Sequence, residues 1–319
     1  MVDRLYRWAA FLVAATYGLL VFGASVRVHG AGLACPDWPL CFGDVVPAID
    51  FEVGLEFGHR VLAGIVSLGF LAIGGTVIAN RRRFGRGPVV LVGIAAVALA
   101  VQIVLGGLTV LHLLAEWTVA SHLLAGNTFC LLLLLLTLSL RDAVVPGAAI
   151  REPVSLGQRA AALALALLVP TQLAVGGLVS SSFAGLACGT WPTCDGVSWF
   201  PTWSGPVGLQ LVHRSVAYAI VGAAAFGLLV ARHGRAGRAA MLVAVAVAVQ
   251  ATIGILNVWW RLPVEVTLAH TAGAAAVVLS TTWLNHEVWR APLGSAHGVG
   301  SIGVSAVDGS KGAPMVEAR

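Results

Sequence analysis

The chain has 319 residues, of which 58% are hydrophobic and only 10% are charged, and its formal net charge is +5. An ordinary soluble domain carries roughly 25% charged residues, so this composition excludes one. The positive charge lies in short runs between apolar segments, and aromatic residues do not alternate with it as they would in a nucleic-acid groove. The sequence therefore predicts a membrane protein that does not bind nucleic acid.

Eight apolar runs follow one another along the chain, and each is about 18 residues or longer, the length that a membrane-spanning helix needs. The runs cover residues 8–26, 58–79, 88–111, 118–140, 159–179, 209–231, 238–260 and 264–286. The first run is expected to be retained as a helix rather than cleaved as a signal peptide. Residues 291–319 are rich in Gly, Ser and Ala, which predicts a disordered tail.

The basic residues are distributed unevenly between the two sides of the predicted helices. Fifteen of the nineteen fall on the side that holds both termini, namely Arg4, Arg7, Arg81, Arg82, Arg83, Arg86, Arg141, Arg151, Arg159, Arg232, Arg235, Arg238, Arg290, Lys311 and Arg319. The other side holds Arg27, Arg60, Arg214 and Arg261. The positive-inside rule makes the crowded side cytoplasmic. Both termini and the tail are therefore expected in the cytoplasm.

A decapeptide and three residues that follow it occur twice in the chain, once in each half. The members are Gly32–Cys41 with His59, Arg60 and His122 in the first half, and Gly185–Cys194 with His213, Arg214 and His270 in the second. An internal repeat of this kind indicates a duplicated structural unit.

The repeat predicts an all-α integral membrane protein built from two tandem four-helix bundles. The halves are residues 1–145 and 159–290, joined by a cytoplasmic linker at 146–158 and followed by the tail 291–319. Four is an even number, so both halves enter the membrane from the same side. A parallel repeat is expected, with a pseudo-twofold axis along the membrane normal.

A shorter string, glutamine followed four residues later by glycine, recurs in three of the apolar runs. It occurs in Gln102–Leu108, Gln172–Leu178 and Gln250–Leu256. Glycine allows membrane helices to approach closely, so these glycines are interpreted as helix-contact residues.

The four repeated histidines are expected to form two pairs, each within one bundle. His59 and His122 are predicted about one turn into helices that run in the same direction, and His213 and His270 repeat that placement. Two histidines at matched depth can bind a haem iron from opposite sides. A zinc site is disfavoured, because each bundle supplies only two histidines and the cysteines lie in loops. The remaining histidines are expected to be solvated: His29, His112, His233, His286 and His297.

One position differs between the halves where the repeat is otherwise close. Glu56 precedes His59 by three residues, whereas Gln210 precedes His213. Residues three apart share a helix face, so Glu56 would stand beside a haem bound by His59, where a carboxylate can take a proton. Glutamine cannot ionise, which favours a reaction site in the first half. The alternative is an interfacial carboxylate near a helix N-terminus.

Two arginines and two pairs of cysteines complete the candidate residues. Arg60 and Arg214 could bind haem propionates, or could extend to the membrane interface. The outer loops hold the pairs Cys35 with Cys41 and Cys188 with Cys194. These pairs fit either loop-tying disulfides or redox-active ones. Cys130 is alone in an apolar run and is expected to be a buried packing residue.

Taken together, Glu56–Arg60 at the outer end of the second run, the later histidines, the paired cysteine loops and the duplicated halves resemble the haem A synthase family, of the cysteine-bearing Gram-positive bacterial type. The resemblance covers about residues 8–286. It implies a bacterial plasma-membrane enzyme that oxidises the C8 methyl group of haem O to a formyl group by successive hydroxylations. The product, haem A, serves cytochrome oxidase.

The resemblance also implies roles for the candidate residues. His59 and His122 would bind the substrate haem O, Glu56 would be the catalytic carboxylate, and His213 and His270 would bind a haem B cofactor. The cysteine pairs would be disulfides. The expected partners are haem O, membrane lipid and an electron donor that no motif identifies. The sequence leaves open whether the chain works alone, with the farnesyltransferase that forms haem O, or as a homo-oligomer.

Two other classes of protein would also use some of these features. A cytochrome b with two bis-histidine haems is the main alternative, but both predicted histidine pairs lie near the outer face, which does not suit electron transfer across the bilayer. A two-repeat transporter would place polar residues at mid-membrane depth, where this chain has Ala, Leu and Val.

Overall fold

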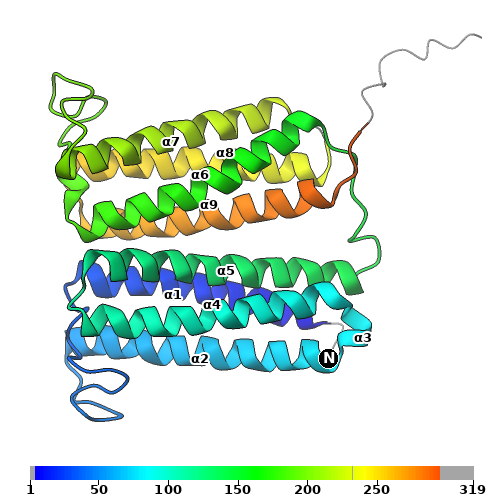
Figure 1. Cartoon of the computed structure of the whole chain (residues 1–319), viewed down its shortest axis with the longest axis horizontal. Coiled ribbons are helices and arrows are strands. Elements are labelled where there is room, and N and C mark those ends of the chain that lie inside the picture. Colours follow the sequence, from blue (N-terminus) through cyan, green and yellow to red (C-terminus); the bar gives the residue numbers. More distant parts are fainter. Residues whose placement is uncertain (1–3, 232, 295–319) are drawn as a thin grey trace, which may run out of the picture.

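The computed structural model describes residues 4–231 and 233–294, and the secondary-structure elements within them are helices joined by loops (Figure 1). The long helices are α1 (Leu5–Val28), α2 (Phe51–Ala79), α4 (Arg86–Leu111), α5 (Glu116–Val144), α6 (Leu156–Ser181), α7 (Gly205–Leu229), α8 (Arg235–Trp259) and α9 (Val264–Arg290). A short helix, α3 (Arg81–Phe84), and a 3-10 turn, η2 (Ala184–Leu186), complete the described elements. Each of the eight long helices is long and apolar enough to cross a membrane, which confirms the predicted all-α membrane fold.

Helix α2 begins at Phe51, earlier than the predicted start at residue 58. The Asp50 carboxylate accepts a hydrogen bond from the Val53 amide and caps the helix. The first turns of α2 are therefore helical although they contain polar residues that hydropathy assigns to a loop. His59 therefore lies in the third turn of α2, and the prediction that it lies in the first turn is wrong. Helix α7 likewise begins at Gly205, ahead of the predicted residue 209.

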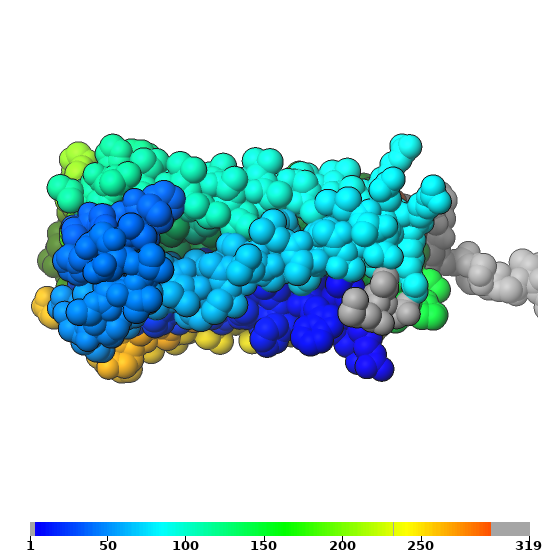
Figure 2. All heavy atoms as spheres, turned by 90° about the horizontal axis from the view of Figure 1, so that it is seen from below, coloured from blue at the N-terminus to red at the C-terminus, as the bar shows by residue number. Residues whose placement is uncertain are grey.

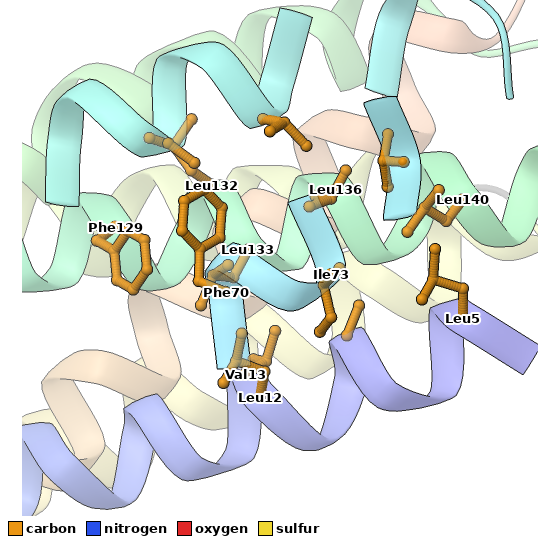
Figure 3. Close-up of a cluster of buried hydrophobic side chains, with 14 of the residues drawn as sticks. Leu5, Leu12, Val13, Phe70, Ile73, Phe129, Leu132, Leu133, Leu136 and Leu140 are labelled. Atoms are coloured by element: carbon orange, nitrogen blue, oxygen red, sulfur yellow. The ribbon is translucent and has the colours of Figure 1, made fainter. Parts of the chain in front are cut away.

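In the first half, α1 contacts α2 and α5, and α4 contacts the same two helices. Helices α2 and α5 therefore face each other across the diagonal of the bundle. The core of this half includes Phe70 and Phe129, whose rings meet edge to face with centroids 5.4 Å apart, beside Leu133 (Figure 3). This core fills the part of the bundle away from His59 and His122.

The second half repeats this arrangement. Helices α6 and α8 each contact both α7 and α9, so α7 and α9 form the diagonal pair. A second core of buried apolar residues, from Val154 to Ala291, belongs to this half. Figure 1 shows the halves as two layers, and α1 and α5 of the first layer contact α6 and α9 of the second. The pseudo-twofold axis stays a prediction.

Polar contacts join the two layers at three levels. At one end, the Arg27 guanidinium on α1 donates to Ser180 on α6. Midway, the Tyr17 hydroxyl donates to the Ala272 carbonyl, 3.0 Å away on α9. At the other end lies a buried ionic cluster, which links α5, the linker, α8 and α9.

His286 belongs to this ionic cluster, so the prediction that it is solvated is wrong. Its Nε2 lies 3.1 Å from an oxygen of Asp142 on α5, and its side chain is almost fully buried. Arg151 of the linker contacts the same Asp142 oxygen at 2.7 Å, and its Nε lies 3.2 Å from Glu287. Glu287, fully buried, also pairs with Arg235 at 2.8 Å. The partners come from distant segments, so hydropathy around residue 286 could not indicate them.

The first residues of the predicted tail are ordered against the linker. The Val154 amide donates to the Pro292 carbonyl at 2.9 Å, and the Gly294 amide donates to the Val154 carbonyl at 3.0 Å. Backbone pairing with the linker therefore continues past the end of α9, through Gly294. The rest of that segment lies outside the described residues.

Candidate functional site

Each of the two predicted ligand histidines in the first half presses its ring against a glycine of the neighbouring helix. A Cβ atom placed on Gly23 of α1 would lie 2.9 Å from Cε1 of His59, and one placed on Gly106 of α4 would lie 3.1 Å from Cε1 of His122. These distances are shorter than ordinary van der Waals contact. The glycines therefore leave the space that the imidazole rings occupy.

The second half repeats these contacts at the corresponding positions. The ring of His213 on α7 lies against Gly176 of α6, and the ring of His270 on α9 lies against Gly254 of α8. A Cβ atom added to Gly176 would lie 2.9 Å from Cε1 of His213, and one added to Gly254 would lie 3.1 Å from Cε1 of His270. All four histidines thus lie on the diagonal helices of their bundles. The interpretation of these glycines as helix-contact residues is refined: their contact is with an imidazole.

The histidines of each half fit a haem iron, which needs two axial ligands, better than a metal ion held by three or more side chains. Within the described residues, no group of three or more His, Cys, Asp or Glu side chains is placed to hold a metal ion. The Nδ1 atoms of His59, His122 and His213 are buried and lack a hydrogen-bond partner. Two buried imidazoles on diagonal helices, with polar atoms still unsatisfied, match the axial ligation that haem iron accepts.

Glu56 is buried at the start of the site and fastens the first cysteine loop to α2. One carboxylate oxygen accepts a hydrogen bond from the Cys35 amide at 2.8 Å, and the other pairs with Arg60 at 2.6 Å. The Arg60 guanidinium also donates to the carbonyls of Asp37 at 2.9 Å and Leu40 at 2.6 Å. In Figure 2 this loop covers one end of the first half as a compact blue cap.

The second loop is fastened by the matching residues, but Gln210 donates to its loop whereas Glu56 accepts from its own. The Gln210 side chain donates to the Gly185 carbonyl at 3.1 Å. Arg214 donates to the carbonyls of Cys188 at 2.9 Å and Thr190 at 2.8 Å. Both arginines therefore bind loop carbonyls, a role that neither of the two sequence interpretations included. Their pairing with haem propionates stays a prediction.

Known proteins of one family match most of the chain. The family model described as COX15-CtaA, cytochrome oxidase assembly protein, matches residues 6–54 and 49–282. The chain belongs to this family. It is 29% identical to a haem A synthase of Shewanella oneidensis, over 85% of this chain and 93% of that protein. It is 30% identical to a haem A synthase of Methylobacterium sp. strain 4-46, over 85% and 88% of the two chains.

A relative with a higher identity covers less of the chain. The haem A synthase of Shouchella clausii is 31% identical over 62% of this chain and 66% of that protein. The family resemblance inferred from the sequence is thereby confirmed, and the chain is an enzyme of haem biosynthesis.

Both cysteine pairs form disulfides, which confirms what the resemblance to the cysteine-bearing type implied for them. The bonds join Cys35 with Cys41 and Cys188 with Cys194, and all four side chains are buried. Both loops also contain a cis Trp–Pro peptide bond, at Trp38–Pro39 and Trp191–Pro192. Cys130 is a free, buried cysteine, as predicted.

Asp37 organises the tip of the first loop, a role that the sequence did not indicate. Its carboxylate accepts hydrogen bonds from the amides of Phe42 at 2.7 Å and Gly43 at 2.8 Å. The Gly43 amide, with a smaller effect from Phe42, lowers the pKa of the Asp37 carboxyl below its usual value. An aspartate followed by glycine within six residues was the only available signal.

The histidines outside the two pairs differ in exposure. His29, His112 and His233 are exposed, which agrees with the prediction. His286 is the exception described above, and His297 lies outside the described residues.

Proposed function

We propose that this chain is a haem A synthase, a membrane oxidoreductase that converts the C8 methyl group of haem O to the formyl group of haem A. Membership of the family and the two histidine pairs support this function. The observation that carries the assignment of roles is the difference between Glu56 and Gln210. These two residues occupy matching positions in α2 and α7 and each fastens its own cysteine loop, Glu56 through the Cys35 amide and Gln210 through the Gly185 carbonyl, yet only one of them can ionise.

In the first half, His59 and His122 bind the substrate haem O, and Glu56 is the catalytic carboxylate. Arg60 pairs with one carboxylate oxygen of Glu56 and the Cys35 amide donates to the other, so both oxygens are held in place at the outer end of α2. Glu56 and His59 are three residues apart on α2, so they share a helix face. A carboxylate at that place can stabilise positive charge that develops on the substrate, or accept a proton from it.

In the second half, His213 and His270 bind a haem B cofactor. When bound, this haem supplies one-electron redox chemistry. Gln210 fastens the loop without offering a titratable group, which suits a permanent site. Arg60 and Arg214 hold the disulfide loops over the outer ends of both bundles, and so restrict the access of water to the sites.

The proposed setting follows from the distribution of charge. The protein lies in the bacterial plasma membrane with both termini in the cytoplasm, and both histidine pairs lie toward the outer face. Figure 1 places the start of α1 and the end of α9 at the same end of the bundles, which supports this topology. The farnesyltransferase that forms haem O and a second copy of this chain are the candidate partners.

The test of the catalytic role is Glu56→Gln. Gln210 shows that glutamine at this position keeps a cysteine loop in place, so the variant should fold and retain haem B. We expect haem A formation to be abolished in membranes that supply haem O. The matched control is Gln210→Glu, which should leave haem A formation largely intact. Normal haem A production by Glu56→Gln would refute the catalytic role.

The test of the cofactor assignment is His213→Ala. Removal of one of two axial ligands should eliminate the tightly bound haem B, as measured by pyridine haemochrome content of the purified protein. The matched variant His59→Ala should keep the haem B content and lose binding of haem O. Unchanged haem B in His213→Ala would contradict the assignment.

A further inference from the structure

The two bundles differ in how closely one pair of neighbouring helices packs. Helices α2 and α4 contact each other less than any other neighbouring pair of long helices within either bundle, whereas their counterparts α7 and α8 contact each other more extensively. Side-chain burial agrees with this difference. Val247 of α8 is almost fully buried, but Leu99, at the matching place in α4, is only partly buried. The first half is therefore more open along its α2–α4 side than the second half is along the matching side.

This opening between α2 and α4 is limited at both ends by close contacts. Toward the cytoplasmic end the helices meet, since a Cβ atom added to Gly74 would lie 3.0 Å from Cγ1 of Val92. Toward the outer end the first cysteine loop, which Arg60 fastens to α2, also touches α4, and a Cβ atom added to Gly107 would lie 3.0 Å from Cδ2 of Trp38. Figure 2 shows a recess between α2 and α4 beside the blue loop.

Small and apolar side chains line the opening. Ala63 and Ser67 precede Gly74 by about three and two helical turns, so they lie on the side of α2 that faces α4. By the same spacing from its contact with α2, helix α4 presents Ala96 and Ile103, and both are exposed. The Ser67 hydroxyl donates to the Ala63 carbonyl at 2.8 Å, so it offers no free proton to the opening.

Larger side chains occupy the matching positions in the second half. Gly64, five residues after the histidine of α2, is exposed, and a Cβ atom added to it would meet nothing within 4 Å. Tyr218 stands five residues after the histidine of α7, and Val221 takes the place of Ser67. The two halves therefore differ in side-chain volume at the same side of the bundle where they differ in helix packing.

We propose that the opening between α2 and α4 receives the farnesyl chain of haem O, which passes through it into the lipid while His59 and His122 bind the iron. This inference rests on the proposed function. The opening begins beside Arg60, the neighbour of His59 along α2, so it leads to these ligands. Haem O carries a farnesyl chain that haem B lacks. The half assigned to haem O has the opening, and the half assigned to haem B has closer helices and a tyrosine there.

The physical reason lies in the packing of a helical bundle. Protein interiors are packed as densely as organic crystals, and extra bulk forced into them is destabilising. A long isoprenoid chain therefore cannot be enclosed in the bundle core, whereas an apolar opening to the bilayer lets it remain in contact with lipid. The opening also lets substrate enter and product leave sideways, so the disulfide loop over the outer end can stay in place.

The variants Ser67→Phe and Gly64→Tyr test this inference, because each adds bulk at the opening. Haem O and haem B are each titrated into purified protein that already holds its second-half haem, and binding to the first half is followed by absorption. We expect Ser67→Phe to weaken binding of haem O about tenfold or more, and to change binding of haem B far less. Gly64→Tyr should act in the same direction. The matched control is Leu68→Phe, an exposed neighbour on the same helix, which should leave both affinities unchanged.

Unchanged binding of haem O in Ser67→Phe, or equal weakening of both haems, would overturn the inference. Retention of the second-half haem reports on folding. If Ser67→Phe loses that haem, Gly64→Tyr decides alone, since its added Cβ atom meets open space. The proposed function fails differently: the unaltered protein would then bind no haem O in its first half, and the inference would fall with it.

Discussion

A single methyl group added at Gly176 should displace His213 and weaken the second haem site. The Cβ atom of alanine would lie 2.9 Å from Cε1 of His213, whereas ordinary contact begins at 3.4 Å, so the ring must retreat by about 0.5 Å. Functional sites tolerate displacements of about this size at most. We therefore expect haem binding to weaken roughly tenfold or more.

The assay is the haem content of Gly176→Ala during dilution in detergent, followed through the absorption of the low-spin haem. Gly222→Ala is the matched control, because it lies on α7 with His213 and its added Cβ meets nothing within 4 Å. Alanine favours a helix by about 1 kcal/mol over glycine, so neither variant should weaken its helix. Equal haem retention in the two variants would show that the glycine does not make room for the ligand.

Three further predictions concern the loops and the ionic cluster. Glu287→Gln should lower the stability of the protein by about 3–5 kcal/mol, since it leaves buried arginine charge unpaired, and thermal unfolding against Glu265→Gln, an exposed position on the same helix, measures it. A Cys35→Ser, Cys41→Ser double variant should lose haem A formation while its second-half haem is retained, as extracted haem would show. Because the pKa of the Asp37 carboxyl is lower in the folded protein than in the unfolded chain, its contribution to the free energy of unfolding is complete at pH values above the unfolded pKa of about 3.9. This contribution is lost as the pH falls through the lower pKa of the folded state. Asp37→Asn should therefore be less stable than the unaltered protein at neutral pH, with a difference that disappears in acid.

The helices could be located from the sequence because membrane spans are long and apolar, and such runs are hard to mistake. Their starts were harder to place. The first turns of α2 contain Glu52 and Glu56, and hydropathy assigns such turns to a loop. Only the Asp50 cap, a contact between side chain and backbone, shows that the helix already includes them.

The candidate site was predictable where the repeat alone carried the information. The two histidine pairs occur at matching positions of the repeat, and Glu56 differs from Gln210 at one such position, so both features can be found by aligning the halves. The partners of these residues cannot be found in this way, because they depend on which helix faces which. The contact of His59 with Gly23 required the packing of α1 against α2.

Residues that join distant segments were the least predictable. Asp142, Arg151 and Glu287 are ordinary loop or helix-end charges when read in order along the chain. In the structure they form one buried cluster between the halves, since the linker returns to the ends of α5 and α9. A polar residue near a helix end can therefore be buried when a later segment folds over it.

The haem composition of membranes that contain this chain tests the proposed function most directly. The chain would be expressed in a bacterial host that makes haem O but no haem A, and the extracted haems would be separated by chromatography and identified by mass. We predict haem A with the unaltered chain and none with Glu56→Gln. A folded, membrane-inserted chain that carries haem B alone, and neither binds nor converts haem O, would contradict the synthase assignment and favour an electron-transfer cytochrome b.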